Sequence, residues 1–276
     1  MLLRHARGTL DLAQPVVMGV LNVTPDSFSD GGRFLDPARA LEQGLRLVAE
    51  GAQIIDVGGE STRPGATPIG TDLELQRVIP VIRALAARCP VLISADTSDP
   101  AVIEQAVDAG AGLINDVRAL QRPGALAAAA RSGAGVCLMH MRGEPATMQQ
   151  AIVYDSVLAE VRAMLVARMA ACAAAGIDAA RVCVDPGFGF GKKLAHNLEL
   201  LRHLAGFADL GVPLVAGLSR KSMLEALTGR RPQQRLAGSI ALATIAVLNG
   251  ALIIRAHDVA ATVDAVRVAW ALRSGA

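Results

Sequence analysis

The sequence predicts an α/β fold, a closed barrel of eight parallel strands known as the (β/α)8 or TIM barrel, from three observations. A β-rich run, a polar loop and an Ala/Leu-rich helical segment recur eight times within 276 residues, which suits a closed barrel. Apolar residues make up 52% and aromatic residues 3% of the chain, as expected for aliphatic parallel strands buried under helices. A glycine also ends several helical segments before the next strand: Gly51, Gly110, Gly133, Gly176 and Gly250.

In chain order, residues 1–14 are expected to form a short N-terminal hairpin or arm that closes one end of the fold. The expected strands are β-branched or apolar runs: 16–22, 54–58, 91–96, 113–117, 135–140, 182–185, 213–218 and 251–257. The expected helices follow these strands: 37–50, 72–87, 100–109, 123–132, 155–175, 197–204, 232–248 and 258–272. No linker or shift in composition interrupts this order, so residues 1–276 are expected to form a single domain.

An open, doubly wound sheet is the alternative fold for the same order of elements. That fold binds dinucleotides through a GxGxxG sequence after the first strand, whereas the first loop here reads Asn22-Val23-Thr24-Pro25. The closed barrel is therefore the favoured prediction.

The composition argues against several classes of function. The net charge is +2 and no block of like charges occurs, so a nucleic-acid partner is not expected. No apolar run approaches the ~18 residues of a membrane span, and no signal-peptide core follows Arg4 and Arg7. The cysteines lack CxxC spacing, which predicts reduced core thiols: Cys89, Cys137, Cys172 and Cys183. These features predict a soluble, cytoplasmic protein.

Polar residues end every predicted strand. Because the carboxyl ends of barrel strands meet at one mouth, these side chains are expected to gather there. They are Asn22, Asp56, Glu60, Asp96, Asn115, Asp116, His140, Asp185, Ser219, Arg220, Lys221, Arg255, His257 and Asp258. A single one of them, such as Asp116 or Asp258, is equally explained as a helix cap or a loop hydrogen bond. Eight polar strand ends together indicate a binding site.

The polar side chains divide into two chemical groups. Asp96, Asn115 and Asp185 suit the donor-rich edge of an aminopyrimidine, since a carboxylate accepts two parallel N–H groups. The cationic or potentially cationic residues suit phosphate: Arg63, Arg220, Lys221, Arg255 and His257. The sequence therefore predicts a site for a polar heterocycle beside a site for an anion.

Three loops at the predicted mouth are unusual in composition. Residues 182–192 deliver Asp185 into a glycine-rich loop, in which Phe190 is expected to form an apolar wall and Phe188 to pack. The loops at 58–66 and 22–34 are long for barrel turns, and the first is expected to carry Arg63 onto a ligand when it closes. Flexible surface loops remain the alternative for both.

Four segments occur in fixed order along the chain: Leu21–Gly32, Gly58–Gly65, Asp185–Lys192 and Gly217–Ser222. They closely resemble the signature segments of the dihydropteroate synthases, and the resemblance continues to Arg255-Ala256-His257-Asp258. Members of that family condense 6-hydroxymethyl-7,8-dihydropterin diphosphate with 4-aminobenzoate, giving 7,8-dihydropteroate and diphosphate for folate biosynthesis. The resemblance implies this activity, Mg2+ as the cofactor, and a homodimer formed through helices late in the chain.

The resemblance also implies a role for each matching residue. The catalytic residues would be Asp96, Asp185, Lys221 and Arg255. The pterin would contact Asp96, Asn115, Met139, Asp185, Phe190, Lys221 and Arg255. The diphosphate would contact Asn22, Arg63, Arg255 and His257, with Mg2+ at Asn22. The aminobenzoate would contact Thr62, Arg63, Pro64, Phe190, Lys221 and Ser222.

These groups indicate a dissociative, SN1-like reaction. Cationic groups and Mg2+ stabilise a leaving diphosphate. An electron-rich dihydropterin delocalises the cation left on its exocyclic CH2, and Asp96 and Asp185 are expected to favour that cation. A neutral arylamine then attacks with little help from a general base.

Two places depart from the family pattern. Ser98-Asp99 stands where a bulkier apolar residue and a lysine are expected, and Arg142 and Glu144 stand where uncharged residues are usual. Changed loop packing or altered charge at the rim is expected, with the chemistry retained. For His140, a structural hydrogen bond and a ligand contact both remain open.

Three other functions compete with this hypothesis. A pterin-binding corrinoid methyltransferase would need the pterin-binding acids but not the Ser-Thr-Arg-Pro loop. A Schiff-base aldolase would use Lys221 as its nucleophile, yet Arg220 and a polar turn precede it. A non-enzymatic paralogue would have lost residues such as Asn22 or Lys221, which are present.

Overall fold

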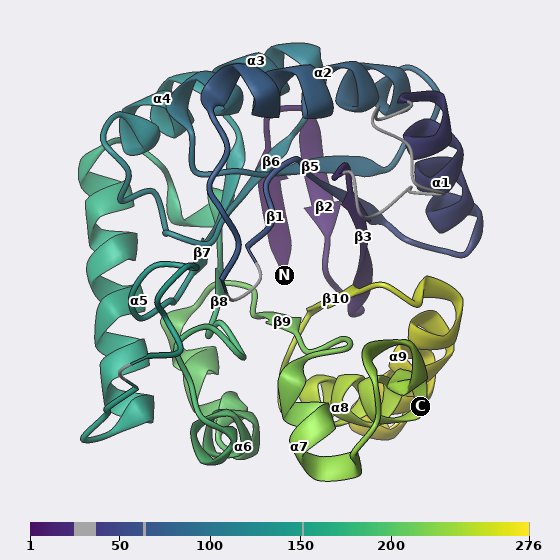
Figure 1. Ribbon diagram of the computed structural model, residues 1–276, viewed down its shortest axis with the longest axis vertical. Coiled ribbons are helices and arrows are strands. Elements are labelled where there is room, and N and C mark those ends of the chain that lie inside the picture. Colours follow the sequence, from purple (N-terminus) through teal and green to yellow (C-terminus); the bar gives the residue numbers. More distant parts are fainter. Residues whose placement is uncertain (25–36, 63–64, 151, 276) are drawn as a thin grey trace.

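The computed structural model describes residues 1–24, 37–62, 65–150 and 152–275, and it confirms the predicted barrel. Eight parallel strands form one sheet in the order β8-β7-β6-β5-β4-β3-β10-β9. A parallel bridge between Val184 and Leu214 joins the first and last strands of this order, so the sheet returns on itself. The helices surround the strands on the outside (Figure 1).

The strands are β1 Leu2–His5, β2 Gly8–Asp11, β3 Val16–Asn22, β4 Ile54–Gly58, β5 Leu92–Asp96, β6 Leu113–Asp116, β7 Gly135–Met139, β8 Val182–Asp185, β9 Val215–Gly217 and β10 Ile253–Ala256. The α-helices are α1 Pro37–Ala49, α2 Thr71–Ala86, α3 Pro100–Ala109, α4 Ala125–Ser132, α5 Val157–Ala174, α6 Leu194–Arg202, α7 Ser222–Thr228, α8 Leu236–Leu248 and α9 Val259–Ser274. Short 3-10 helices occur at Ala179–Arg181, Leu204–Leu210 and Pro232–Gln234.

The predicted strands all exist, and three of them, β3, β4 and β8, have the predicted bounds. The sequence did not reveal α7, a seven-residue helix that buries only Met223 and Leu224. Two buried positions are too few to establish a helical period.

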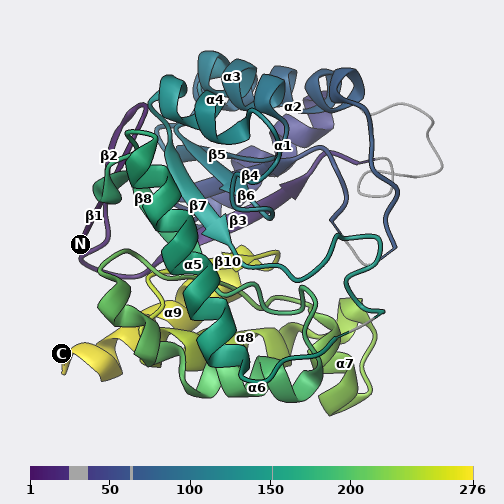
Figure 2. The ribbon, with the colours of Figure 1, turned by 90° about the vertical axis from the view of Figure 1, so that its left-hand side faces the viewer.

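The N-terminal hairpin, β1 with β2, closes one end of the barrel, as predicted. Leu3 and Leu12 are fully buried there, against the inward-facing side chains at the amino ends of the barrel strands. Figure 2 shows the hairpin at one end of the barrel and the connection between β4 and α2 at the other. One end of the barrel is therefore filled by apolar side chains.

The inward-facing side chains form an apolar layer and, next to it, a polar layer. Ile54, Leu113 and Ile253 belong to the buried cluster inside the barrel. Side chains two residues apart in a strand face the same side. The inward positions one step closer to the carboxyl ends are therefore Asp56, Asn115 and Arg255 on these same strands. The two-residue period of the strands therefore places a polar layer next to the apolar layer, on the side of the carboxyl ends.

Among the described residues, no helix combines the length and the apolar composition needed to cross a membrane.

Candidate active site

Arg255 is the centre of the polar layer inside the barrel. Its Nε donates to Asp56 Oδ2 at 2.7 Å, and its Nη2 donates to Asp96 Oδ2 at 2.8 Å. Asp56 is fully buried and also accepts from Ser94 Oγ at 2.6 Å and from Asn115 Nδ2 at 3.0 Å. The guanidinium therefore joins β10 to β4 and β5 through two carboxylates.

Asp56 received no role in the sequence analysis beyond its place at a strand end. One feature of the sequence indicates a structural role for Asp56: it is a single carboxylate inside the apolar strand Ile54–Gly58, where a charge needs a buried partner. Its bond to Asn115 Nδ2 fixes the amide orientation, so that Oδ1 of Asn115 stays available to a ligand donor. Asp56 thus orients two predicted pterin-binding residues, Asn115 and Arg255.

Burial controls the protonation of this network. It raises the pKa of Asp96, as does the Asp56 carboxylate, whereas the Arg255 guanidinium opposes the rise. Burial also disfavours the Arg255 cation, but the charges of Asp56 and Asp96 outweigh this and raise the pKa of Arg255. Arg255 therefore stays cationic, and Asp96 is poised to gain a proton more readily than an exposed aspartate.

The loop after β8 brings Asp185 into the same space. Asp185 Oδ1 accepts from Gly187 N at 2.7 Å, and burial raises the pKa of Asp185. Gly187 has φ +71°, and a Cβ there would lie 1.8 Å from His140 O, so only glycine fits. A Cβ at Gly217 would lie 3.7 Å from Asp185 Oδ2 and 3.8 Å from Arg255 Cβ, so the absent side chain leaves space between these two groups.

Phe190 and Lys221 form one wall of the mouth. Lys221 Nζ lies 4.1 Å from the centroid of the Phe190 ring. Burial lowers the pKa of Lys221 to about 8, and the Asp185 charge opposes this decrease. Phe188, by contrast, is 1% exposed and belongs to the core between strands and helices, so it packs as expected.

Lys192 is a buried cation that the sequence analysis did not assign. Its Nζ donates to Gly187 O at 2.8 Å and to Phe190 O at 3.1 Å, and it lies 2.9 Å from His140 Nδ1. Burial lowers the pKa of Lys192 to about 7 and that of His140 to about 3. Neutral His140 thus has Lys192 as a structural hydrogen-bond partner, while a ligand contact at His140 stays a prediction.

The predicted anion-binding residues differ more from expectation. The backbone N of His257 donates to Ser219 Oγ at 3.2 Å. The ring Nδ1 of His257 lies 3.1 Å from the same oxygen. Burial, then the charges of Arg255 and Arg220, lower the pKa of His257 to about 3, so it is neutral rather than cationic. Arg220 is paired with Asp258, donating from Nε to Oδ2 and from Nη2 to Oδ1. Neutral His257 offers a phosphate a donor, not a charge.

The remaining predicted residues lie around this mouth or outside the described part of the chain. Asn22 ends β3, half-buried, and its carboxamide makes no hydrogen bond to a described residue. Met139 is buried at the end of β7, beside Asp185 in the register of β7 with β8. Thr62 follows β4 and Ser222 begins α7. Arg63 and Pro64 lie outside the described residues.

The four departures from the family pattern all have partners away from Asp185 and Lys221. Ser98 donates to Asp116, and Asp99 caps α3 by accepting from Ala101 N at 2.9 Å. Arg142 pairs with Glu160 and lies 3.9 Å from the centroid of the Tyr154 ring. Glu144 accepts from Arg118 Nε at 2.9 Å.

Comparisons with known proteins point to one family. The model of the pterin binding enzyme family matches residues 18–257. The dihydropteroate synthase of Escherichia coli is 54% identical over 98% of this chain and 96% of its own length. That of Haemophilus influenzae is 49% identical over 94% of each chain.

Solved structures show the same likeness in three dimensions. A Yersinia pestis dihydropteroate synthase in a sulfonamide drug complex superposes with a TM-score of 0.95 at 51% identity, covering 99% of this chain and 100% of that one. A Xanthomonas albilineans dihydropteroate synthase with 4-aminobenzoic acid gives a TM-score of 0.91 at 53% identity, covering 96% of each chain. The same enzyme in complex with 7,8-dihydropteroate gives 0.88 at 50% identity, again over 96% of each chain.

Proposed function

The chain belongs to the dihydropteroate synthases of the pterin-binding enzyme family, and from this premise we propose how its own residues perform the reaction. The enzyme is a transferase of folate biosynthesis. It condenses 6-hydroxymethyl-7,8-dihydropterin diphosphate with 4-aminobenzoate to give 7,8-dihydropteroate and diphosphate. The observation that carries the assignment of residues is the Asp56, Asp96, Asn115 and Arg255 network in the barrel mouth.

We assign pterin recognition to the buried acids and amide. Asp185 and Asp96 accept N–H groups of the aminopyrimidine edge, and Asn115 Oδ1 accepts one more. Asp56 holds Asn115 and Arg255 in the orientations that this requires. Lys221 and Arg255 bring positive charge close to the ring, and Met139 and Phe190 supply apolar surface.

We assign the diphosphate to Asn22 at the end of β3, to Arg255 and His257 at the end of β10, and to Arg63, which lies outside the described residues. The residues present fit a Mg2+ ion beside that diphosphate. Mg2+ binds through few protein oxygens and several phosphate and water oxygens, and the Asn22 carboxamide supplies one oxygen without a described competitor. When bound, Mg2+ neutralises charge on the leaving diphosphate. Among the described residues no cluster of three acidic, His or Cys ligands occurs, which agrees with a site completed by substrate.

We assign the aminobenzoate to the space between Thr62, Arg63 and Pro64 on one side and Phe190, Lys221 and Ser222 on the other. The Lys221 ammonium attracts the carboxylate of this substrate, and the Phe190 ring lies against its aromatic face. The Yersinia pestis structure in a sulfonamide complex shows that a relative binds such drugs, and we expect sulfonamides to compete here.

The geometry favours an SN1-like step. The bond between the exocyclic CH2 and the diphosphate oxygen breaks first, and its electron pair leaves with diphosphate. The acids Asp96 and Asp185 favour the resulting pterin cation. The amine nitrogen then forms the C–N bond and releases one proton. The oxygen between the exocyclic CH2 and the diphosphate can be labelled with a heavy isotope. In recovered, unreacted dihydropterin diphosphate, the label is expected to exchange with the other oxygens of the same phosphate, because the bond breaks before the amine attacks. A label that never exchanges would contradict this order.

The assignment is tested by pyrophosphate release from the purified protein. Release is expected only when the dihydropterin diphosphate, aminobenzoate and Mg2+ are all present, and EDTA should lower the rate at least tenfold because the leaving charge is no longer neutralised. Asn22→Ala should raise the Mg2+ concentration that gives half-maximal rate. No release by the wild-type protein would contradict the function, and release unaffected by EDTA would contradict the metal.

We further propose that residues 1–276 act as a single cytoplasmic domain that forms a homodimer. The four cysteines are free thiols, which suits a reducing compartment. Helices α7, α8 and α9 expose large apolar side chains: Leu227, Leu236, Ile245, Leu248, Val268 and Leu272. Such side chains favour an interface between copies of the chain. A monomer mass in light scattering at micromolar concentration would contradict the dimer.

A further inference from the structure

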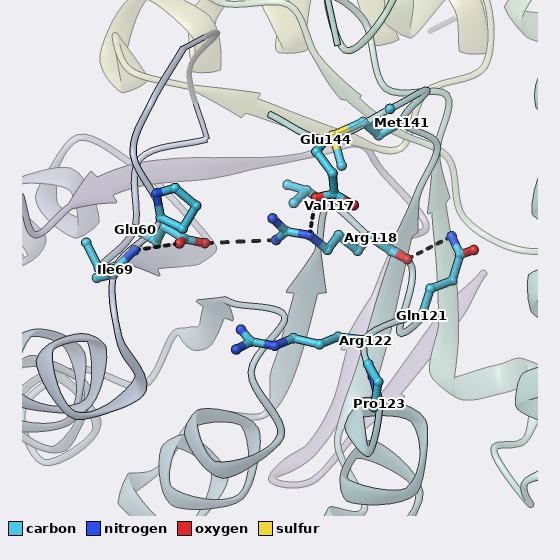
Figure 3. Close-up of a pocket in the computed structure, with 11 residues that line it drawn as sticks. Glu60, Ile69, Val117, Arg118, Gln121, Arg122, Pro123, Met141 and Glu144 are labelled. Atoms are coloured by element: carbon cyan, nitrogen blue, oxygen red, sulfur yellow. Dashed lines mark hydrogen bonds and ion pairs between the residues drawn. The ribbon is translucent and has the colours of Figure 1, made fainter. Parts of the chain in front are cut away.

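A cavity of about 640 Å³ lies at the rim of the mouth, beside the predicted substrate residues. It is bounded by the connections that follow β4, β6 and β7, and Arg118 extends across it from the end of β6 (Figure 3). Its walls contain Glu60 on one side and Glu144 on the other. Glu60 is the one polar strand-end residue of the sequence analysis that lines it, and none of the residues assigned above to the pterin, the diphosphate or the aminobenzoate does.

The Arg118 guanidinium contacts three other connections. Nε donates to Glu144 Oε2 at 2.9 Å, and Nη1 donates to Ser98 Oγ at 3.2 Å. Nη1 also lies 3.9 Å from Glu60 Oε2. The Arg118 side chain is 18% exposed and that of Glu60 16%, so this pair is shielded from water, whereas the Glu144 side chain is 64% exposed. Solvent screening is therefore weak for Glu60 and strong for Glu144.

Arg118 is itself held firmly. Its backbone N donates to Asp116 Oδ1 at 2.8 Å, and Asp116, fully buried, accepts also from Leu120 N at 2.8 Å. The Arg118 side chain therefore extends from a turn whose backbone is held by the buried Asp116 carboxylate.

Glu60 joins the two ends of the connection between β4 and α2. Its Oε1 accepts from Ile69 N at 3.1 Å, while Oε2 faces Arg118. Thr62 lies between Glu60 and Ile69 in the sequence. The position of Glu60 therefore sets where this loop leaves the barrel and where it returns.

A second contact joins the same loop to the connection between β7 and α5. Gly65 N donates to Pro145 O at 3.3 Å, and Pro145 directly follows Glu144. The two loops thus meet through one backbone hydrogen bond and through their shared partner Arg118.

We propose that Arg118 is a positioning residue for aminobenzoate: it anchors Glu60 and Glu144, and so holds the loop that presents Thr62 to the mouth. This inference rests on the proposed function of that loop. Arg118 touches neither the reacting atoms nor the pterin-binding residues, so its effect should fall on aminobenzoate affinity and leave the chemical step intact.

The test compares Arg118→Gln with a matched control, Arg122→Gln. Arg122 lines the same cavity but pairs with Asp99 at 3.2 Å, a residue that caps α3. In Arg118→Gln the KM for aminobenzoate is expected to rise about tenfold, the size of effect that loss of a charged hydrogen-bond donor produces. The KM for the dihydropterin diphosphate and kcat should stay within about twofold, and Arg122→Gln should resemble the wild type.

Glu60→Gln gives an independent measurement, because it keeps an acceptor for Ile69 N and removes only the charge. Its aminobenzoate KM should rise, and the double variant with Arg118→Gln should be no worse than Arg118→Gln alone, since both changes break one contact. Fully additive effects, or an equal rise in the KM of both substrates, would overturn the proposal.

Amide hydrogen exchange separates this proposal from the function on which it rests. In the absence of substrates, Arg118→Gln should accelerate exchange in the segments 59–62 and 65–70 relative to wild type and to Arg122→Gln. Unchanged exchange there would refute the role of Arg118 even in an active enzyme. Absence of aminobenzoate-dependent turnover in the wild type would refute the function, while faster exchange in Arg118→Gln would still support the anchor.

Discussion

Replacing Arg255 with methionine is expected to lower kcat/KM by about 10²- to 10³-fold, the usual effect of losing a donor to developing charge. It is also expected to destabilise the fold by about 3 kcal/mol, because two buried carboxylates lose their shared cation. Methionine approximates the length of the arginine stem, so packing changes little. Steady-state kinetics and urea unfolding measure the two effects.

The stability loss in Arg255→Met should depend on pH. The folded state raises the pKa of Asp96 above its unfolded value, so it binds more protons and stability falls as pH rises through that window. Loss of Arg255 raises this pKa further, and the deficit should be larger near pH 8 than near pH 5. Arg162→Met, which breaks an exposed ion pair with Asp209, is the control and should leave activity and stability unchanged. A pH-independent deficit would show that Asp96 does not depend on Arg255.

Replacing Lys221 with methionine is the change expected to have the second largest effect, a loss of about 10²-fold in kcat/KM. The Lys221 ammonium places a positive charge close to both substrates in the proposed site. Burial lowers the pKa of Lys221 to about 8. Lys221 is thus charged below that pH and neutral above it. The wild-type kcat/KM should therefore fall as pH rises through about 8, and this alkaline decrease should be absent from Lys221→Met.

Lys193→Met is the matched control for Lys221, since Lys193 is exposed at the start of α6. It should keep both the rate and the alkaline decrease. Lys192, with its pKa lowered to about 7, is a second buried cation nearby. If the alkaline decrease persists in Lys221→Met, the titrating group is not Lys221.

The barrel was predictable because its signal is repeated and local. Each strand carries its own β-branched run, and each helix that follows has enough residues to show its period. The polar mouth was equally predictable, since strand ends in a barrel converge whatever the details of packing. By contrast, α7 is too short to give a period.

The partners of the site residues were not predictable. Nothing local in Arg255 or Asp56 shows that residues 199 positions apart share a hydrogen bond. His257 reads as a potential cation in the sequence, but burial beside Arg255 and Arg220 makes it neutral. Lys192 looks like a loop lysine in the sequence, yet it is buried in the fold, where its Nζ has four hydrogen-bond partners. Protonation and pairing depend on tertiary neighbours, which composition and spacing do not report.

The hairpin under the barrel has a consequence for turnover. Leu3 and Leu12 fill the amino end of the barrel, so the mouth is the only way in or out for a ligand held on the polar layer within the described part of the chain. Dihydropteroate joins the pterin of one substrate to the aminobenzoate of the other, so under the proposed assignment it is expected to occupy both substrate sites at once. Until it departs neither substrate can enter, so the product should inhibit competitively against each of them.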